Sequence, residues 1–215
     1  MERRYVLTAC GTVLTGMLAG CGGGGGEATE TATATETATE TATATATETA
    51  EPTATETPGP DGPTHDVGES FTVGSGDEAI GYRIVELFRA DRVGSQANND
   101  VADGTFLIII LELSNPRENE ISFPNNNFQV WNEEQIRYLD DRATPRIGDD
   151  DRIDVTPIGT ASVLAGESIT GAVLFDVDPD RTYWIRVLPT GDSGETHYVP
   201  LGSVADIEEL QGSFT

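Results

Sequence analysis

A long stretch without any large apolar side chain divides the sequence into two unequal parts. Residues 22–63 contain only glycine, alanine, threonine, glutamate, proline and aspartate, and from Thr29 to Thr49 every second residue is threonine. A period of two usually indicates a β-strand, but here neither face carries a side chain whose burial could offset the entropy of ordering the chain. The sequence therefore predicts a disordered, acidic stalk over residues 21–65, and the folded core must follow it.

The residues before the stalk have the features of an export signal. Arg3 and Arg4 precede a short apolar stretch, which ends in Leu18, Ala19, Gly20 and Cys21. This stretch is shorter than the ~20 apolar residues of a membrane-spanning helix, and threonine and glycine dilute it. Its end resembles a lipobox, so residues 1–20 are predicted to be a lipoprotein signal peptide, and Cys21 is predicted to carry a lipid. The alternative is an uncleaved N-terminal anchor.

The arginine pair also resembles a twin-arginine export motif, although Glu2 stands where that motif has serine or threonine. Export by that route would deliver an already folded protein. Both interpretations of the N-terminus place the rest of the chain on the extracytoplasmic face of the cell membrane, at the cell surface. The membrane is then a partner through the lipid on Cys21.

Charge and cysteine content exclude several classes of function. The chain has 37 acidic residues against 12 basic ones, all of them arginine, and its formal net charge is −25. Nucleic acid is excluded as a partner because phosphate binding needs a basic surface. The two cysteines, Cys10 and Cys21, both lie at the N-terminus, so the body of the protein has neither a disulfide framework nor a catalytic thiol.

The absence of lysine together with the excess of acidic residues resembles proteins of salt-loving archaea. At molar salt the Debye length falls to about 3 Å, and self-repulsion of this size becomes tolerable. Most carboxylates are therefore assigned to solubility rather than to a ligand site.

The residues after the stalk predict an all-β domain. The strongest strand is Thr105–Ser114, in which Glu112 must face outward, so that Leu107, Ile109, Leu111 and Leu113 face the core. Turn signals recur between the strand candidates, and no segment keeps a helical period. We expect an antiparallel β-sandwich over residues 66–202 and a C-terminal tail over residues 203–215. The other predicted strands are Glu69–Val73, Ile80–Ala90, Phe128–Trp131, Gln135–Leu139, Ser168–Asp176, Thr182–Leu188 and His197–Leu201.

The order of several short motifs resembles a known family. Val67-Gly68-Glu69-Ser70-Phe71 opens the domain, Glu112-Leu113-Ser114-Asn115 ends its long strand, and Phe128-Gln129-Val130, Leu164-Ala165-Gly166-Glu167 and residues 170–177 follow. In this order they are similar to an immunoglobulin-like domain of unknown function found on prokaryotic lipoproteins, which is grouped with the immunoprotective extracellular superfamily. The resemblance implies an immunoglobulin-like β-sandwich outside the cell and no catalytic residues.

Candidate ligands for a metal lie in two acidic loops. Asp176, Asp178 and Asp180 have the spacing that opens a calcium loop, but Arg181 and Val187 occupy the positions where a helical calcium site needs glycine and a carboxylate. A looser Ca²⁺ site at this turn is one interpretation, and an acidic turn stiffened by proline is the other. The second loop, residues 149–154, is interpreted as solvated.

Aromatic side chains offer a candidate binding surface. Trp184 and Arg186 share one strand face, opposite Tyr183, Ile185 and Val187, so Trp184 is expected to be exposed. Together with Trp131, Tyr138, Tyr183 and Tyr198 it could form a patch for carbohydrate or protein, although aromatic residues in a sandwich more often belong to the core.

No catalytic constellation is recognisable, and the two histidines, His65 and His197, have no convincing nucleophile beside them. We therefore expect a non-enzymatic binding module, held off the membrane by its stalk, that binds a protein or an envelope component without a cofactor. The alternative is an ion or ligand sensor accessory to a membrane transporter or signalling protein, using one of the acidic loops.

Overall fold

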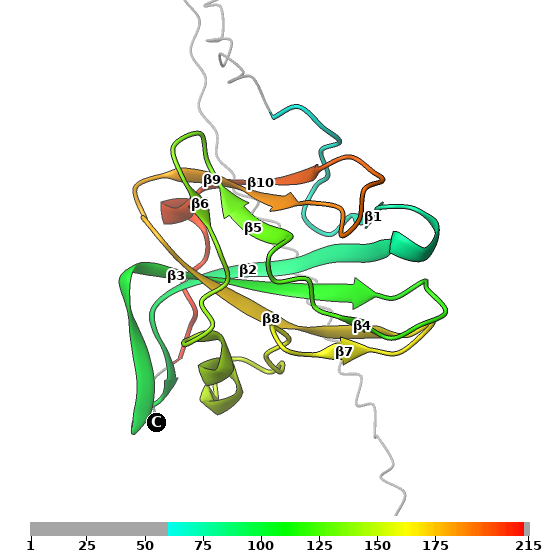
Figure 1. Cartoon of the computed structure of the whole chain (residues 1–215). Coiled ribbons are helices and arrows are strands. Elements are labelled where there is room, and N and C mark those ends of the chain that lie inside the picture. The colour runs from blue at the N-terminus through cyan, green and yellow to red at the C-terminus, as the bar shows by residue number, and fades with distance from the viewer. Residues whose placement is uncertain (1–59, 213–215) are drawn as a thin grey trace, which may run out of the picture. The chain divides into compact units, whose positions relative to one another are not determined.

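The computed structural model of the protein describes residues 60–212, which form two packed antiparallel sheets (Figure 1). The first sheet has the order β1-β2-β3-β8, and the second has the order β10-β9-β5-β6. A third, two-stranded sheet pairs β4 with β7. The predicted all-β sandwich is thereby confirmed. The strands are β1 (Ser70–Val73), β2 (Ile80–Ser95), β3 (Asn98–Ser114), β4 (Ile121–Ser122), β5 (Phe128–Trp131), β6 (Ile136–Arg137), β7 (Ser162–Val163), β8 (Ser168–Val177), β9 (Thr182–Val187) and β10 (His197–Ser203).

The main core lies between the two large sheets. The alternation of β3 places Leu107, Ile109, Leu111 and Leu113 in this core with no exposed surface, as the position of Glu112 predicts. The facing sheet contributes the alternate residues of β5 and β9, namely Phe128, Val130, Tyr183, Ile185 and Val187. Each sheet thus buries one face against the other.

The outer face of the first sheet is also buried, which the sequence did not predict. Ile108 and Ile110 of β3 lie in a second hydrophobic cluster, together with Ala143, Ile147 and Leu210. The covering residues come from the segment around the 3-10 helix η2 (Thr144–Asp149) and from the C-terminal segment that follows the short 3-10 helix η3 (Val204–Asp206). The apolar residues of β3 on both faces therefore have partners. In the loop interpreted as solvated, Asp149, Asp151 and Asp154 are exposed, whereas Asp150 and Ile153 are buried.

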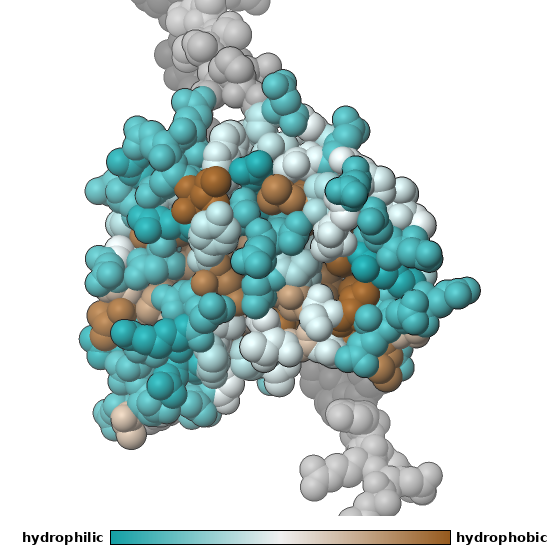
Figure 2. Space-filling model, in the orientation of Figure 1, coloured by the Kyte–Doolittle hydropathy of each residue, from teal (hydrophilic) through white to brown (hydrophobic). Residues whose placement is uncertain are grey.

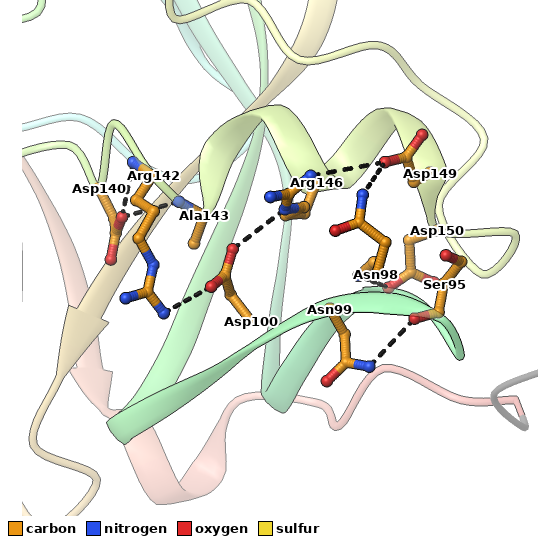
Figure 3. A network of polar contacts seen from close by, with 11 residues as sticks. Ser95, Asn98, Asn99, Asp100, Asp140, Arg142, Ala143, Arg146, Asp149 and Asp150 are labelled. Atoms are coloured by element: carbon orange, nitrogen blue, oxygen red, sulfur yellow. Dashed lines mark hydrogen bonds and ion pairs between the residues drawn. The ribbon is translucent and has the colours of Figure 1, made fainter.

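A long hairpin arm extends the first sheet beyond the sandwich. The predicted strand Ile80–Ala90 continues to Ser95, β3 begins at Asn98, and Asp100 in this arm is only 8% exposed. Asp100 accepts contacts from Arg142 at 2.5 Å and from Arg146 at 3.1 Å, which tie the arm to the η2 segment (Figure 3). On the same side, the amide of Gly94 donates to Asp150 at 3.0 Å. These polar contacts attach the arm to residues 142–150, at a place outside the main core.

The residues that enter the sandwich form a short strap along its edge. This strap, residues 60–65, runs beside β10: the amide of His65 donates to the carbonyl of Tyr198 at 2.9 Å, and the amide of Tyr198 donates to the carbonyl of Pro63 at 2.9 Å. Gly62 has φ +151°, and a Cβ there would lie 2.3 Å from the carbonyl oxygen of Thr196. The strap covers hydrogen-bonding groups that an edge strand would otherwise expose. The predicted domain boundary at Asp66 falls directly after it.

The surface agrees with the acidic composition. Figure 2 shows hydrophilic side chains over most of the face in view, with hydrophobic ones in small separate patches. No helix within residues 60–212 is long and apolar enough to cross a membrane. The predicted export motif (Arg3, Arg4) and lipobox (Leu18, Ala19, Gly20 and Cys21) lie outside the described residues.

Candidate binding groove on the outer face of the second sheet

Alternation along three strands gives the second sheet an outer face rich in aromatic side chains. In β9, Tyr183, Ile185 and Val187 are completely buried in the core, while Trp184 and Arg186 are only partly buried on the opposite side. This confirms the predicted shared face of Trp184 and Arg186. Trp131 of β5 is partly buried on the side opposite the core residue Val130, whereas Tyr198 of β10, opposite the core residue Val199, is only 8% exposed.

The strand register aligns these outer residues in two rows. Trp131 pairs directly with Trp184, and Trp184 pairs with Pro200 on the other side. In the second row, Arg186 lies between Gln129 and Tyr198. The rings of Trp131 and Tyr198 are 5.9 Å apart between centroids and are tilted by 54°, so the two rows are in contact. The sheet thereby holds three aromatic rings in fixed relative positions.

These rings line a groove with a volume of about 980 Å³. Its walls combine the aromatic floor with side chains of the β5–β6 turn, with the start of β9 and with the strap. The lining residues are Pro60, Asp61, Trp131, Asn132, Glu133, Glu134, Arg181, Thr182, Trp184 and Tyr198. Concave sites of this size, with a few polar groups around apolar walls, are typical of ligand-binding sites.

An arginine holds the wall of the groove in place. Arg181 forms an ion pair with Glu134 of the β5–β6 turn, and its Nε donates to Asp178 at 3.0 Å. Beneath it, the Nε2 of Gln135 donates to the buried hydroxyl of Tyr183 at 2.7 Å. The β5–β6 and β8–β9 turns are therefore joined at one end of the groove, which fixes the carboxylates on its rim.

Two carboxylates of the predicted calcium turn, those of Asp176 and Asp178, are used in contacts within the protein, and Asp180 contributes its backbone amide. Asp176 accepts hydrogen bonds from the amides of Asp103 at 2.7 Å and Gly104 at 3.0 Å. Asp178 accepts from Arg181 and from the amide of Asp180. Hydrogen bonds from the Asp180 amide and from Arg181 lower the pKa of Asp178. Within residues 60–212, no three histidine, cysteine or acidic side chains gather in a group that could hold a metal ion.

Two polar atoms in the second row are buried without a hydrogen-bond partner among the described residues. These are the Nε of Arg186 and the Oε1 of Gln129, which belong to cross-strand neighbours. Because buried polar groups in proteins normally form hydrogen bonds, an unpaired donor and an unpaired acceptor mark this part of the sheet as incompletely satisfied. Arg186 thus belongs to the outer face that contains the groove, although it does not line the groove.

The strap brings the two histidines of the chain together near the groove. The Nε2 of His65 lies 2.9 Å from the Nδ1 of His197, and the Nδ1 of His65 lies 3.0 Å from a carboxylate oxygen of Glu69. Burial lowers the pKa of His197, and the electrostatic effect of the neighbouring His65 lowers it further, against the opposing effect of Glu195. No sequence pattern joins these residues, because 132 positions separate the histidines.

The sequence predicted the aromatic residues of the groove, but it also predicted two that lie outside it and missed the residues of the strap. Of the five named aromatic residues, Trp131, Trp184 and Tyr198 line the groove, whereas Tyr183 is buried in the core and Tyr138 is exposed outside it. The contribution of Pro60 and Asp61 was missed, because the strap has the composition of the stalk. The two Gly-Pro pairs within residues 58–63 were the available signal for a change of structure.

Comparison with known proteins gives similarities of structure. No protein-family model matches the chain, and no curated protein matches it. A secreted protein of Mycobacterium tuberculosis, MPT63, is 15% identical, with a TM-score of 0.45 over 66% of this chain and 99% of its own. A candidate lipoprotein from Staphylococcus aureus is 8% identical, with a TM-score of 0.40 over 67% of this chain and 100% of its own.

A β-sandwich protein from Clostridium difficile has 12% identity and a TM-score of 0.40, over 67% of this chain and 99% of its own. At such identities the similarity concerns the fold alone. The predicted membership of the immunoprotective extracellular superfamily stays a prediction, as does the salt-loving origin.

Proposed function

We propose that the protein is a lipid-anchored surface protein whose β-sandwich is a non-catalytic module that binds neutral glycans in the groove on its second sheet. The observation that carries this proposal is the alignment of Trp131, Trp184 and Tyr198 across three strands, in a groove with a polar rim. Flat aromatic rings on a rigid sheet can pack against the apolar faces of sugar rings, and the partly exposed indoles leave such contacts free.

The rim supplies the polar half of such a site. Asn132 and Thr182 offer donors and acceptors, and Glu133, Glu134 and Asp61 offer acceptors to sugar hydroxyl groups. The basic residue among the groove's lining residues, Arg181, is already paired with Glu134 and Asp178. The rim is therefore negative, which disfavours glycans that carry carboxylate or sulfate groups.

A volume of about 980 Å³ lies at the upper end of the range for small-molecule sites and can accommodate a short stretch of an oligosaccharide. The predicted stalk and lipid on Cys21 would hold the module at some distance from the membrane, where envelope glycans are present. Placement at the extracytoplasmic face of the membrane is thus part of the proposal. It is supported by the lipobox and by the composition of residues 22–63.

Binding is measurable without a label because both tryptophans of the chain line the groove. The full-length protein in detergent is titrated with a panel of neutral and acidic oligosaccharides while tryptophan emission is recorded. We expect saturable changes with neutral members only. Trp184→Ala should weaken binding by about 30-fold, the cost of losing a ~2 kcal/mol contact.

The matched control is Tyr138→Ala, which removes an aromatic side chain that is 56% exposed but lies outside the groove. Its affinity should equal that of the unaltered protein. Equal losses in both variants, or preferential binding of acidic glycans, would contradict the proposed site.

The anchor has a separate test. Cys21→Ala should move the protein from the membrane fraction to the soluble fraction after a carbonate wash, because the lipid would have no attachment point. A variant that remains with the membranes would favour the uncleaved N-terminal anchor instead.

A further inference from the structure

A pair of imidazole rings joins the strap to β10. The strap itself makes few contacts: two backbone hydrogen bonds join it to Tyr198, and Thr64 forms an isolated parallel bridge with the same residue. Beside them, His65 of the strap meets His197 at the start of β10. The side chains of these two residues thus hold the point where the chain enters the fold.

The geometry of the pair is that of a direct nitrogen-to-nitrogen hydrogen bond. The two ring planes are parallel to within 9°, with centroids 5.1 Å apart, and their facing nitrogens are separated by 2.9 Å. Phe71 of β1 lies against both rings, at 4.2 Å from His65 and 5.6 Å from His197 between centroids. Packing on Phe71 keeps the imidazole planes parallel, with the facing nitrogens within hydrogen-bond distance.

Such a bond depends on protonation. It needs a hydrogen on one of the facing nitrogens and a lone pair on the other, so it exists when one or both rings are neutral. With Glu69 accepting from the Nδ1 of His65, that ring can carry its second hydrogen on Nε2 and donate to a neutral His197. When both rings are protonated, two N–H groups and two positive charges face each other, and the contact becomes repulsive.

The charged groups around the pair set the direction of the response. Glu69 contacts His65 from the turn before β1, and Glu195 acts on His197 from the loop before β10. Burial and His65 outweigh Glu195, so the pKa of His197 lies below its ordinary value and the ring stays neutral at neutral pH. The pair is therefore intact at neutral pH and loses its hydrogen bond in acid.

We infer that the His65–His197 pair is a pH-operated latch: it holds the strap on β10 at neutral pH and releases the strap when both rings are protonated. Release removes Pro60 and Asp61 from the wall of the groove, because both belong to the strap. Tyr198 loses its strap hydrogen bonds at the same time, and its ring forms part of the groove. The regulation of ligand binding rests on the proposed function, whereas the latch itself does not.

The latch is tested by hydrogen–deuterium exchange of the full-length protein in detergent at constant molar salt. The amides of His65 and Tyr198 report directly, because each donates across the contact between strap and β10. Their protection factors should fall at least about tenfold between about pH 7.5 and about pH 5, since each pH unit changes a protonation equilibrium tenfold. The amide of Leu111 in the main core should keep its protection.

His197→Gln is the decisive variant, because glutamine keeps a hydrogen-bonding side chain but does not titrate in this range. Its strap amides should show no pH-dependent loss of protection, and His65→Gln should behave in the same way. A wild-type protein whose strap stays protected at about pH 5 would overturn the latch. The latch would also be overturned if both glutamine variants lost as much strap protection between the two pH values as the wild type does.

Glycan titration at the same two pH values separates the latch from the proposed function. A strap that opens while glycan affinity falls supports the coupling between them. A strap that opens with no change in affinity overturns the coupling. A strap that opens in a protein that binds no glycan at about pH 7.5 contradicts the proposed function and leaves the latch standing.

Discussion

At the scale of single residues, Asp150 shows that an acidic residue of this chain can be structural rather than solvating. It is 4% exposed and accepts hydrogen bonds from the Gly94 amide at 3.0 Å and from Arg152 at 2.9 and 2.7 Å. Burial alone would raise the pKa of Asp150, but the hydrogen bonds from Arg152 and from the two backbone amides outweigh it and lower the pKa.

Asp150→Ala should therefore destabilise the protein by about 3 kcal/mol, because it removes the buried carboxylate that accepts from the Arg152 side chain and from the Gly94 amide. Denaturant unfolding at constant salt measures the loss. The control is Asp149→Asn, since Asp149 has a side chain that is 51% exposed and a distant ion pair of 4.0 Å. A loss below about 0.5 kcal/mol for Asp150→Ala would show that this loop does not contribute to stability.

The lowered pKa of Asp150 also predicts how the stability of the fold depends on pH. A carboxylate whose pKa is lower in the folded state stabilises the fold above its unfolded pKa of about 4, and this contribution disappears as the pH falls through the folded value. Wild-type stability should fall in this acidic range more steeply than that of Asp150→Ala. Parallel curves for the two proteins would contradict the assignment.

At the scale of elements, the segment around η2 acts as a third layer. Ile147 is 1% exposed and packs with Ile108 and Leu174 on the outer face of the first sheet. Ile147→Ala should cost about 2–4 kcal/mol because it leaves a cavity beneath the layer. Ile136→Ala on β6, where the side chain is 40% exposed, should change the free energy of unfolding by less than about 0.5 kcal/mol. Equal effects in calorimetry would mean that the layer is not a cooperative part of the fold.

The same elements show what the sequence could and could not predict. Alternation along Thr105–Ser114 predicted the main core, because one outward-facing glutamate fixed the phase of the strand. The covered outer face was missed because the η2 segment mixes aspartates with scattered apolar residues, which have no period. Strand alternation predicted that Trp184 and Arg186 share one face of β9, as its burial pattern shows, whereas their part in binding stays a prediction. The pairing of His65 with His197 depends on the register of the strap, which no local pattern encodes.

At the scale of the whole molecule, we expect the net charge to lower the stability of the fold in dilute salt. A formal charge of −25 on 215 residues produces self-repulsion, which salt screens over a Debye length of about 3 Å at 1 M. The melting temperature should therefore rise by several degrees between about 0.1 and 2 M KCl, since 1 kcal/mol of relieved repulsion corresponds to about 2–4 °C in a protein of this size. A neutral osmolyte of equal osmolality should raise it less. A melting temperature that does not rise with KCl would contradict a role of the acidic surface in adaptation to salt.

We propose that the molecule binds its ligand on the outer face of the second sheet. The most direct measurement is a two-dimensional NMR titration of the isotope-labelled full-length protein with the neutral oligosaccharide that changes its tryptophan emission most. We predict that the shifted signals include both indole N–H groups and the amides around Trp131, Trp184 and Tyr198, and that the signals of residues 143–155 do not move. Shifts concentrated on the η2 segment or the hairpin arm, with unchanged indole signals, would contradict the account.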